Sequence, residues 1–156
     1  MVLTEILKSC PGARGVLFDL EHVVNGAKKR IASTGLEVRC ATAHGDFFQA
    51  VPEGDAYIMK HILHDWDDAR ASRILENIHH AARPGARLLL LEAVLAPGNA
   101  PHFGKWIDIE MLLLPGGRER TEEEYRSLLV AGGFRLTRVV PNQSPLSLLE
   151  AVRVDS

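Results

Sequence analysis

The stretch that decides the fold is residues 57–92, YIMKHILHDWDDARASRILENIHHAARPGARLLLLE. It contains an apolar strand, a His-Asp-Trp turn, an amphipathic helix and a second apolar strand, a succession typical of parallel α/β proteins. His64 falls just past the end of the first strand, at the edge where loops of open α/β sheets converge on a ligand crevice. A histidine there can move a proton near neutral pH, so the stretch indicates an enzyme.

The same alternation of strand and helix continues on both sides of this stretch. We expect helices over 2–10, 23–34, 67–83 and 105–114, and strands over 14–20, 36–42, 56–60, 86–95, 134–140 and 147–154. Thr121 and Glu124 have the spacing of a capping box, which begins one more helix. The last two strands are joined by a linker too short for a helical crossover, so this pair should be antiparallel. The pattern predicts an α/β fold with a mostly parallel sheet covered on both faces.

Length and composition favour one ordinary globular domain. The chain has 156 residues, of which 46% are hydrophobic and 24% charged, with a formal net charge of -2. Interspersed charges of this kind exclude a nucleic-acid or membrane-surface footprint. The first ten residues do not have the pattern of a signal peptide, and we predict a cytoplasmic protein. Cys10 and Cys40 make no metal spacing or disulfide framework and are expected to be buried free thiols.

Four segments together resemble one family, the S-adenosylmethionine-dependent O-methyltransferases of the plant caffeate and hydroxyindole type with their bacterial relatives. These segments are GARGVLFDLEHVV, HGDFFQAVPEGDAYIMKHILHDWDD, ARPGARLLLLEAV and PGGRERTEEEY. The His-Asp-Trp turn in combination with Gly-Gly-Arg-Glu-Arg-Thr is specific, whereas either alone is weak. The resemblance implies transfer of a methyl group from S-adenosylmethionine to a hydroxyl of a small aromatic metabolite.

The resemblance also implies roles for single residues. His64 matches the family's catalytic base, and Glu92 and Glu119 match the acids that support it. An unpaired carboxylate inside a strand as apolar as that around Glu92 would be costly, which supports a partner for it. The positions that match cofactor contacts are Asp19, Asp46, Phe47 and Lys60. Asp108 and Met111 match positions near the substrate, although helix packing explains Met111 equally well.

The sequence departs from the family before Met1. The family's central first strand and glycine-rich turn should precede this residue, and we expect the amino-terminal dimerisation domain to be absent from residues 1–156 as well. We therefore expect residues 1–156 to be a partial catalytic domain with an incomplete Rossmann-like sheet. In the family the absent strand lies between the strands that end at Asp19 and Lys60, so two unpaired sheet edges should remain.

Other interpretations stay open. The chain could be a non-catalytic module that associates with itself, as a homodimer, or with a full-length partner through its open sheet edges. A nucleotide-binding or hydride-transfer domain would explain Asp19 but not the two motifs above. His61 and His64 stand in an H-x-x-H pattern, but neighbours on a strand point to opposite faces and no spacing resembles a zinc site. We predict no metal.

Overall fold

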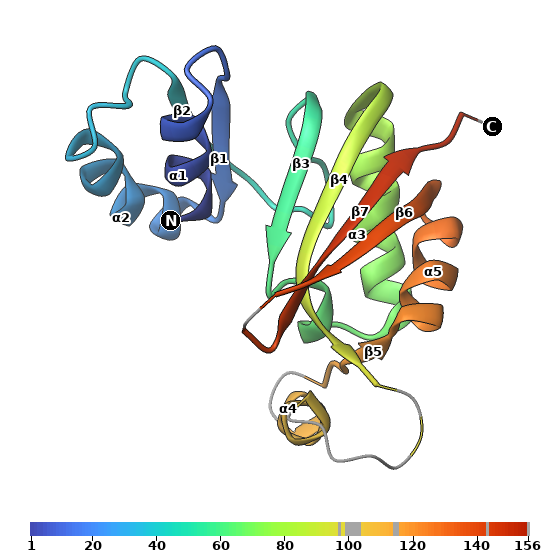
Figure 1. The fold of residues 1–156 in the computed structure, drawn as a ribbon. Coiled ribbons are helices and arrows are strands. Elements are labelled where there is room, and N and C mark those ends of the chain that lie inside the picture. Colours follow the sequence, from blue (N-terminus) through green and yellow to red (C-terminus); the bar gives the residue numbers. More distant parts are fainter. Residues whose placement is uncertain (97, 99–103, 114–115, 143, 156) are drawn as a thin grey trace. The chain divides into compact units, whose positions relative to one another are not determined.

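The computed structural model describes residues 1–96, 98, 104–113, 116–142 and 144–155 (Figure 1). The chain divides into two compact units, Met1–Pro52 and Glu53–Ser156, and each is described by itself. Both combine strands with helices, as the alternating pattern of the sequence predicts.

The first unit is a pair of parallel strands with two helices. Its elements are α1 (Val2–Ser9), β1 (Gly15–Asp19), α2 (Glu21–Ala32) and β2 (Cys40–His44). The two strands pair in register from Gly15 opposite Cys40 to Asp19 opposite His44, so their carboxyl ends lie side by side. Apolar side chains from both helices and from the segment leading into β2 form the core, namely Leu7, Ile31, Leu36 and Cys40.

The second unit is built on a mixed sheet. Its main strands are β3 (Gly54–Lys60), β4 (Ala82–Leu95), β6 (Phe134–Pro141) and β7 (Leu146–Arg153), in the spatial order β3-β4-β7-β6. β3 runs parallel to β4, whereas β7 is antiparallel to both β4 and β6. A short strand, β5 (Arg120–Thr121), pairs in parallel with the end of β4. The predicted α/β class and the antiparallel closing pair are confirmed.

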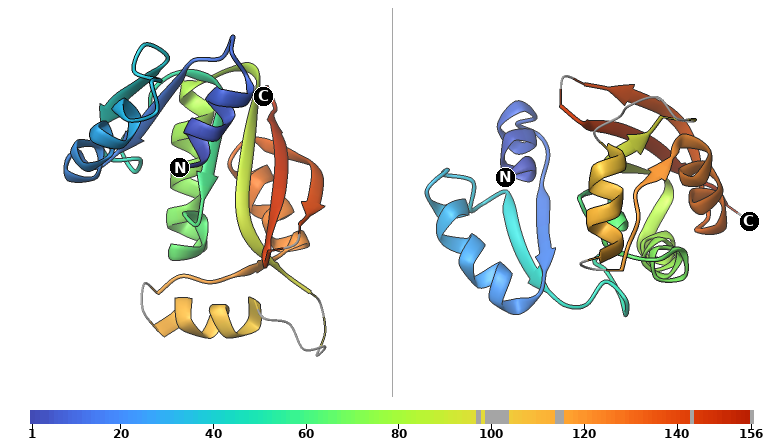
Figure 2. Two further views of the ribbon diagram at one scale, coloured as in Figure 1. Left: turned by 60° about the vertical axis from the view of Figure 1, so that its left-hand side comes forward. Right: turned by 90° about the horizontal axis from the view of Figure 1, so that it is seen from below.

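Two helices cover one face of this sheet. α3 (Asp68–Ala81) and α5 (Glu122–Ala131) lie side by side against the strands (Figures 1 and 2), and α4 (Gly104–Leu113) lies beyond the end of β4. Asp67 caps α3 by accepting a hydrogen bond of 2.8 Å from the amide of Arg70. The predicted capping box at Thr121 and Glu124 is present at the start of α5. Apolar side chains of these layers are almost fully buried, among them Ile74, Leu75, Leu88, Leu90, Tyr125, Leu129, Phe134 and Leu149.

Several predicted boundaries differ from the structure. β2 begins at Cys40 rather than Leu36, because the Leu36 carbonyl accepts the amides of Arg39 and Cys40 in a turn. β4 begins at Ala82, before the Pro-Gly pair that we expected to precede it, since its first residue pairs with Gly54 of β3. The end of the helix predicted over 105–114 lies outside the described residues.

Each unit has edge strands, and two of them, β1 and β3, concern the predicted gap in the sheet. In the described part of the chain, β1 pairs with β2 alone and β3 pairs with β4 alone. These are the two strands that the resemblance predicts to flank an absent strand. Within the same residues, no helix is long and apolar enough to cross a bilayer.

Candidate active site

The candidate site is centred on His64, in the turn that follows β3. The last backbone hydrogen bond to the sheet is from the His61 amide to the Leu91 carbonyl. Beyond it the chain forms a short 3-10 turn, η1 (Leu63–Asp65). This turn folds the His64 side chain inward, where only 7% of the residue stays exposed. A polar ring buried to this degree needs hydrogen-bonding partners.

Glu119 supplies the partner of the imidazole ring. Its Oε1 atom lies 2.8 Å from Nδ1 of His64, and the glutamate is 2% exposed. Because an ionised carboxylate can only accept, Nδ1 carries the proton and Nε2 is the basic nitrogen of the neutral ring. Burial alone lowers the pKa of the His64 imidazole, but the hydrogen bond to Glu119 and the charges of nearby carboxylates outweigh it. The net pKa therefore lies above its ordinary value of 6.5.

Glu92 holds the backbone of the same turn. It is fully buried on β4, and its Oε1 atom accepts the amides of Ile62 and Leu63, each at 3.0 Å. Burial raises the pKa of its carboxyl from 4.5 to about 7. The two glutamates that match the family's supporting acids thus make different contacts, since Glu119 contacts the ring and Glu92 contacts the chain that carries it.

The loop that carries Glu119 lies directly against the His64 turn. The Arg118 amide donates to the His64 carbonyl at 2.9 Å. A β-carbon at Gly117 would lie 2.0 Å from that same carbonyl oxygen, so only glycine allows this approach. Gly117 was not among the predicted site residues, and the Gly-Gly pair within the quoted motif is its signal in the sequence.

Arg120 is a second residue of the site that the sequence did not predict. Its side chain is fully buried, and Nε and Nη2 donate to the same Asp68 carboxylate oxygen at 2.9 and 2.8 Å. The guanidinium also donates to the carbonyls of Leu63 and Trp66, each at 2.9 Å. These carbonyls flank His64, so Arg120 fixes both ends of the turn. A charged residue between a glutamate and a helix cap gives no local sign of such burial.

The two predicted substrate residues lie on α4. The Asp108 carboxylate accepts the Glu119 amide at 2.8 Å, so it supports the acid that contacts His64. The Met111 carbonyl accepts the amides of Gly116 and Gly117 at 3.0 and 3.1 Å. Both residues therefore help to hold the loop beside the His64 turn.

The predicted cofactor residues are divided between the units. Asp19 ends β1, and Asp46 and Phe47 follow β2, so these three belong to one carboxyl edge. Each aspartate accepts a nearby backbone amide, from Leu20 at 2.7 Å and from Phe48 at 2.8 Å. Lys60 ends β3 in the second unit, four positions before His64, and is exposed.

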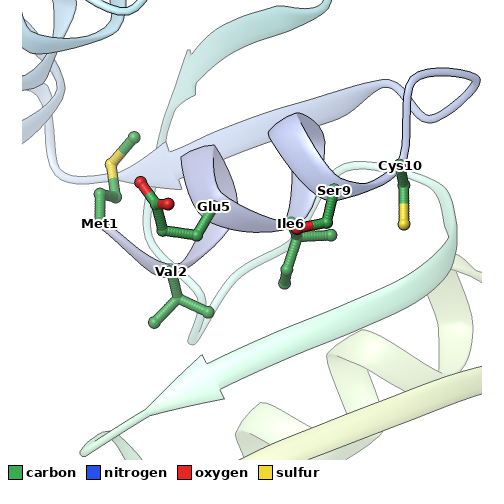
Figure 3. A pocket seen from close by; sticks show the side chains of 6 residues that line it. All are labelled: Met1, Val2, Glu5, Ile6, Ser9 and Cys10. Atoms are coloured by element: carbon green, nitrogen blue, oxygen red, sulfur yellow. The ribbon is translucent and has the colours of Figure 1, made fainter.

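A surface pocket lies along α1, outside these residues. Figure 3 shows the six side chains that line it, which are Met1, Val2, Glu5, Ile6, Ser9 and Cys10. None of them is a predicted site residue. Of the two cysteines, Cys40 is buried as expected, but Cys10 is exposed, so the prediction of a buried thiol there was wrong. Cys10 follows the end of α1, where the chain turns back at the surface.

Comparison with known proteins gives a consistent result. A family model described as an O-methyltransferase domain matches residues 1–135. A phenazine O-methyltransferase, PhzM, of Lysobacter antibioticus is 50% identical over 151 residues, which cover 96% of this chain and 44% of that protein.

Solved structures agree with it. The LaPhzM crystal structure has a TM-score of 0.92 at 49% identity, covering 98% of this chain and 46% of the other. The O-methyltransferase NcsB1 from neocarzinostatin biosynthesis, solved with S-adenosylmethionine and 2-hydroxy-5-methyl naphthoic acid, has a TM-score of 0.87 at 31% identity, covering 98% and 45%. The chain thus spans less than half the length of these relatives.

Proposed function

This chain belongs to the O-methyltransferase domain family, and from that premise we propose that it carries the catalytic residues for methyl transfer to a hydroxyl of a small aromatic compound. The observation that carries the proposal is the buried contact between Nδ1 of His64 and Glu119. The other ring nitrogen, Nε2, lies 3.3 Å from a carboxylate oxygen of Asp65, and we assign it to take the proton of the acceptor hydroxyl.

The chemistry requires a base because a phenol has a pKa of about 10 and is mostly protonated at neutral pH. S-adenosylmethionine supplies an electrophilic methyl group on its sulfonium. Nε2 of His64 removes the hydroxyl proton while the oxygen forms its bond to that methyl carbon and the carbon–sulfur bond breaks. The buried carboxylate of Glu119 then stabilises the imidazolium that results. The products are a methyl ether, S-adenosylhomocysteine and a proton held by His64.

The donor set of the first unit fits an adenosine. The Asp19 carboxylate, at the end of a parallel strand, can accept the two hydroxyls of a ribose. Asp46 can accept an exocyclic amine, and Phe47 offers a flat apolar surface to the ring. The Phe47 ring makes an edge contact with Phe48, with centroids 4.9 Å apart, which supports its orientation. Lys60, which ends β3 in the second unit, is proposed as a cofactor contact on the resemblance alone.

The acceptor should be a hydroxylated aromatic molecule. NcsB1 was solved with hydroxynaphthoic acids, which are of this class. In this chain Asp108 and Met111 are proposed to lie near the acceptor, on the helix that supports Glu119. Their backbone and carboxylate contacts would couple acceptor binding to the loop that orients His64.

Two measurements test this proposal. Isothermal titration with S-adenosylhomocysteine should give saturable binding that Asp19→Asn weakens, and Asp55→Asn, an exposed aspartate on β3, serves as the control. Transfer of a labelled methyl group to a panel of hydroxylated aromatics should be lost in His64→Gln and kept in His80→Gln. Binding without transfer to any acceptor would refute catalysis by this chain, and no heat would refute independent cofactor binding.

A second function is favoured by the edge strands. β1 and β3 each present one unpaired edge in the described residues, and such edges can pair with another chain. On this hypothesis the chain associates with a second copy or a longer partner and need not be catalytic. Sedimentation over a range of concentrations tests it, because a monomer at every concentration would contradict self-association.

A further inference from the structure

Three side chains with metal-binding atoms converge where β3 ends. His61, His64 and Glu92 each offer one such atom, and these atoms lie within 4.8 Å of one another. Two imidazole nitrogens with a carboxylate oxygen are a donor set that Zn²⁺ accepts in proteins. In a regular strand His61 and His64 would point to opposite faces, which is why the sequence predicted no metal, but the backbone at His61 is not that of a regular strand.

His61 has an unusual backbone conformation. Its φ of 54° is the one positive value for a non-glycine residue among those described, and a side chain is disfavoured in this region. The conformation, followed by the η1 turn, brings its ring to 4.9 Å from that of His64, between centroids. Strained residues of this kind gather at functional sites, where the surrounding structure holds them.

Glu92 has an oxygen atom free for a ligand. Its Oε1 atom is occupied by two backbone amides, but Oε2 is buried and has no hydrogen-bond partner in the described structure. A fully buried carboxylate oxygen without a partner is costly and calls for an explanation. A cation between Oε2 and the two histidines would provide one.

The His64 ring is already held as a metal-binding histidine is held. Metal-binding histidines usually donate their second ring nitrogen to a carboxylate, which fixes the tautomer and raises the basicity of the coordinating nitrogen. The contact between Nδ1 of His64 and Glu119 is such an arrangement.

We propose that His61, His64 and Glu92 bind one divalent transition-metal ion of the zinc class. Ligand atoms about 2.1 Å from a shared ion lie within roughly 3.5 Å of each other, so the three groups must close by on the order of 1 Å. Because the ion would occupy the lone pair that proton removal needs, bound metal should inhibit methyl transfer. That consequence rests on the proposed function, whereas the binding itself does not.

Titration of the chelator-treated 156-residue chain tests the proposal. Zn²⁺ is followed by calorimetry and Co²⁺ by its visible absorption bands, so neither readout depends on methyl transfer. His61→Asn removes one ligand while asparagine still tolerates a positive φ. Glu92→Gln keeps an oxygen for the two backbone amides but removes the free carboxylate oxygen. His80→Asn, at an exposed position of α3, is the matched control.

The expected result is one ion per chain, with binding at least about tenfold weaker in both site variants and unchanged in the control. Circular dichroism should show that all three variants are folded. Binding as tight in His61→Asn or Glu92→Gln as in the parent chain would overturn the proposal. So would the absence of saturable binding, or a loss confined to His80→Asn, which would assign the ion to surface histidines.

Discussion

Gly117 lies so close to the carbonyl of His64 that a β-carbon on the glycine would sit 2.0 Å from the carbonyl oxygen. The Arg118 amide donates a hydrogen bond to the same oxygen. Two segments more than fifty positions apart in the chain therefore meet backbone to backbone, and this contact sets where Glu119 stands relative to the imidazole ring.

Replacing Gly117 should disrupt this contact. In Gly117→Ala the added carbon meets backbone atoms of three successive residues, so the loop must move, and we expect a loss of about 1–3 kcal/mol in the free energy of unfolding. Urea unfolding followed by tryptophan fluorescence measures it. Gly54→Ala is the control, because its added carbon meets no atom closer than 3.5 Å. Equal effects of the two substitutions would contradict the close approach.

Removing the carboxylate beside the ring should change the titration of His64. Glu119→Gln deletes the charge and the ionic hydrogen bond that raise the pKa of His64, so this pKa should fall below that of the parent chain. Nuclear magnetic resonance of the imidazole measures it directly. Glu122→Gln, at an exposed position of α5, should leave it unchanged. On the proposed function, methyl transfer at neutral pH should drop by about 10²–10⁴-fold in Glu119→Gln.

The buried acid and base predict a pH dependence of stability. The folded-state pKa of Glu92 is raised to about 7 and that of His64 is raised above 6.5, so the folded chain binds more protons than the unfolded chain in this range. Stability should therefore fall as pH rises from about 5 to about 8. For Glu92 the shift corresponds to on the order of 3 kcal/mol.

The variant Glu92→Gln isolates the contribution of Glu92 to this pH dependence. The glutamine side chain does not titrate, and its carbonyl oxygen can still accept the two backbone amides. Its unfolding free energy should vary less between pH 5 and pH 8 than that of the parent chain, in parallel urea titrations. A parent chain that becomes more stable across this window would show that Glu92 is ionised without cost.

Arg120 should matter more than a surface arginine. In Arg120→Lys the single ammonium cannot serve Asp68 and the two carbonyls together, so we expect a loss of about 3 kcal/mol. Arg126→Lys, whose ion pair with Glu122 is exposed on α5, should cost less than about 0.5 kcal/mol. If Arg120 acts only on stability, the resonances of the His64 ring should stay unchanged in the folded variant. We expect them to shift.

The fold was largely predictable from local patterns. The apolar run around Leu88 and Leu90 predicted a buried strand, and the spacing of Thr121 and Glu124 predicted the helix start that the structure has. Strand β5 could not be predicted, because Arg120 and Thr121 are too few for a periodicity and their partners on β4 are far away in the sequence.

The site was predictable in part. The place of His64 after a strand pointed to chemistry, and the resemblance supplied Glu92 and Glu119, which the structure brings to the same turn. The resemblance could not show that Glu119 contacts the imidazole ring whereas Glu92 contacts the backbone of the turn. Arg120 escaped notice because the burial of a charged side chain depends on partners far away in the sequence.

By itself, the sequence determined the order and type of the main elements, because hydrophobic periodicity and capping act between near neighbours in the chain. Only the tertiary structure decided which carboxylate touches the imidazole, why Gly117 must be glycine, and that His61 turns toward His64. These depend on backbone segments that approach within hydrogen-bonding distance across the fold. Such a distance between segments far apart in the chain cannot be inferred from the spacing of residues in the sequence.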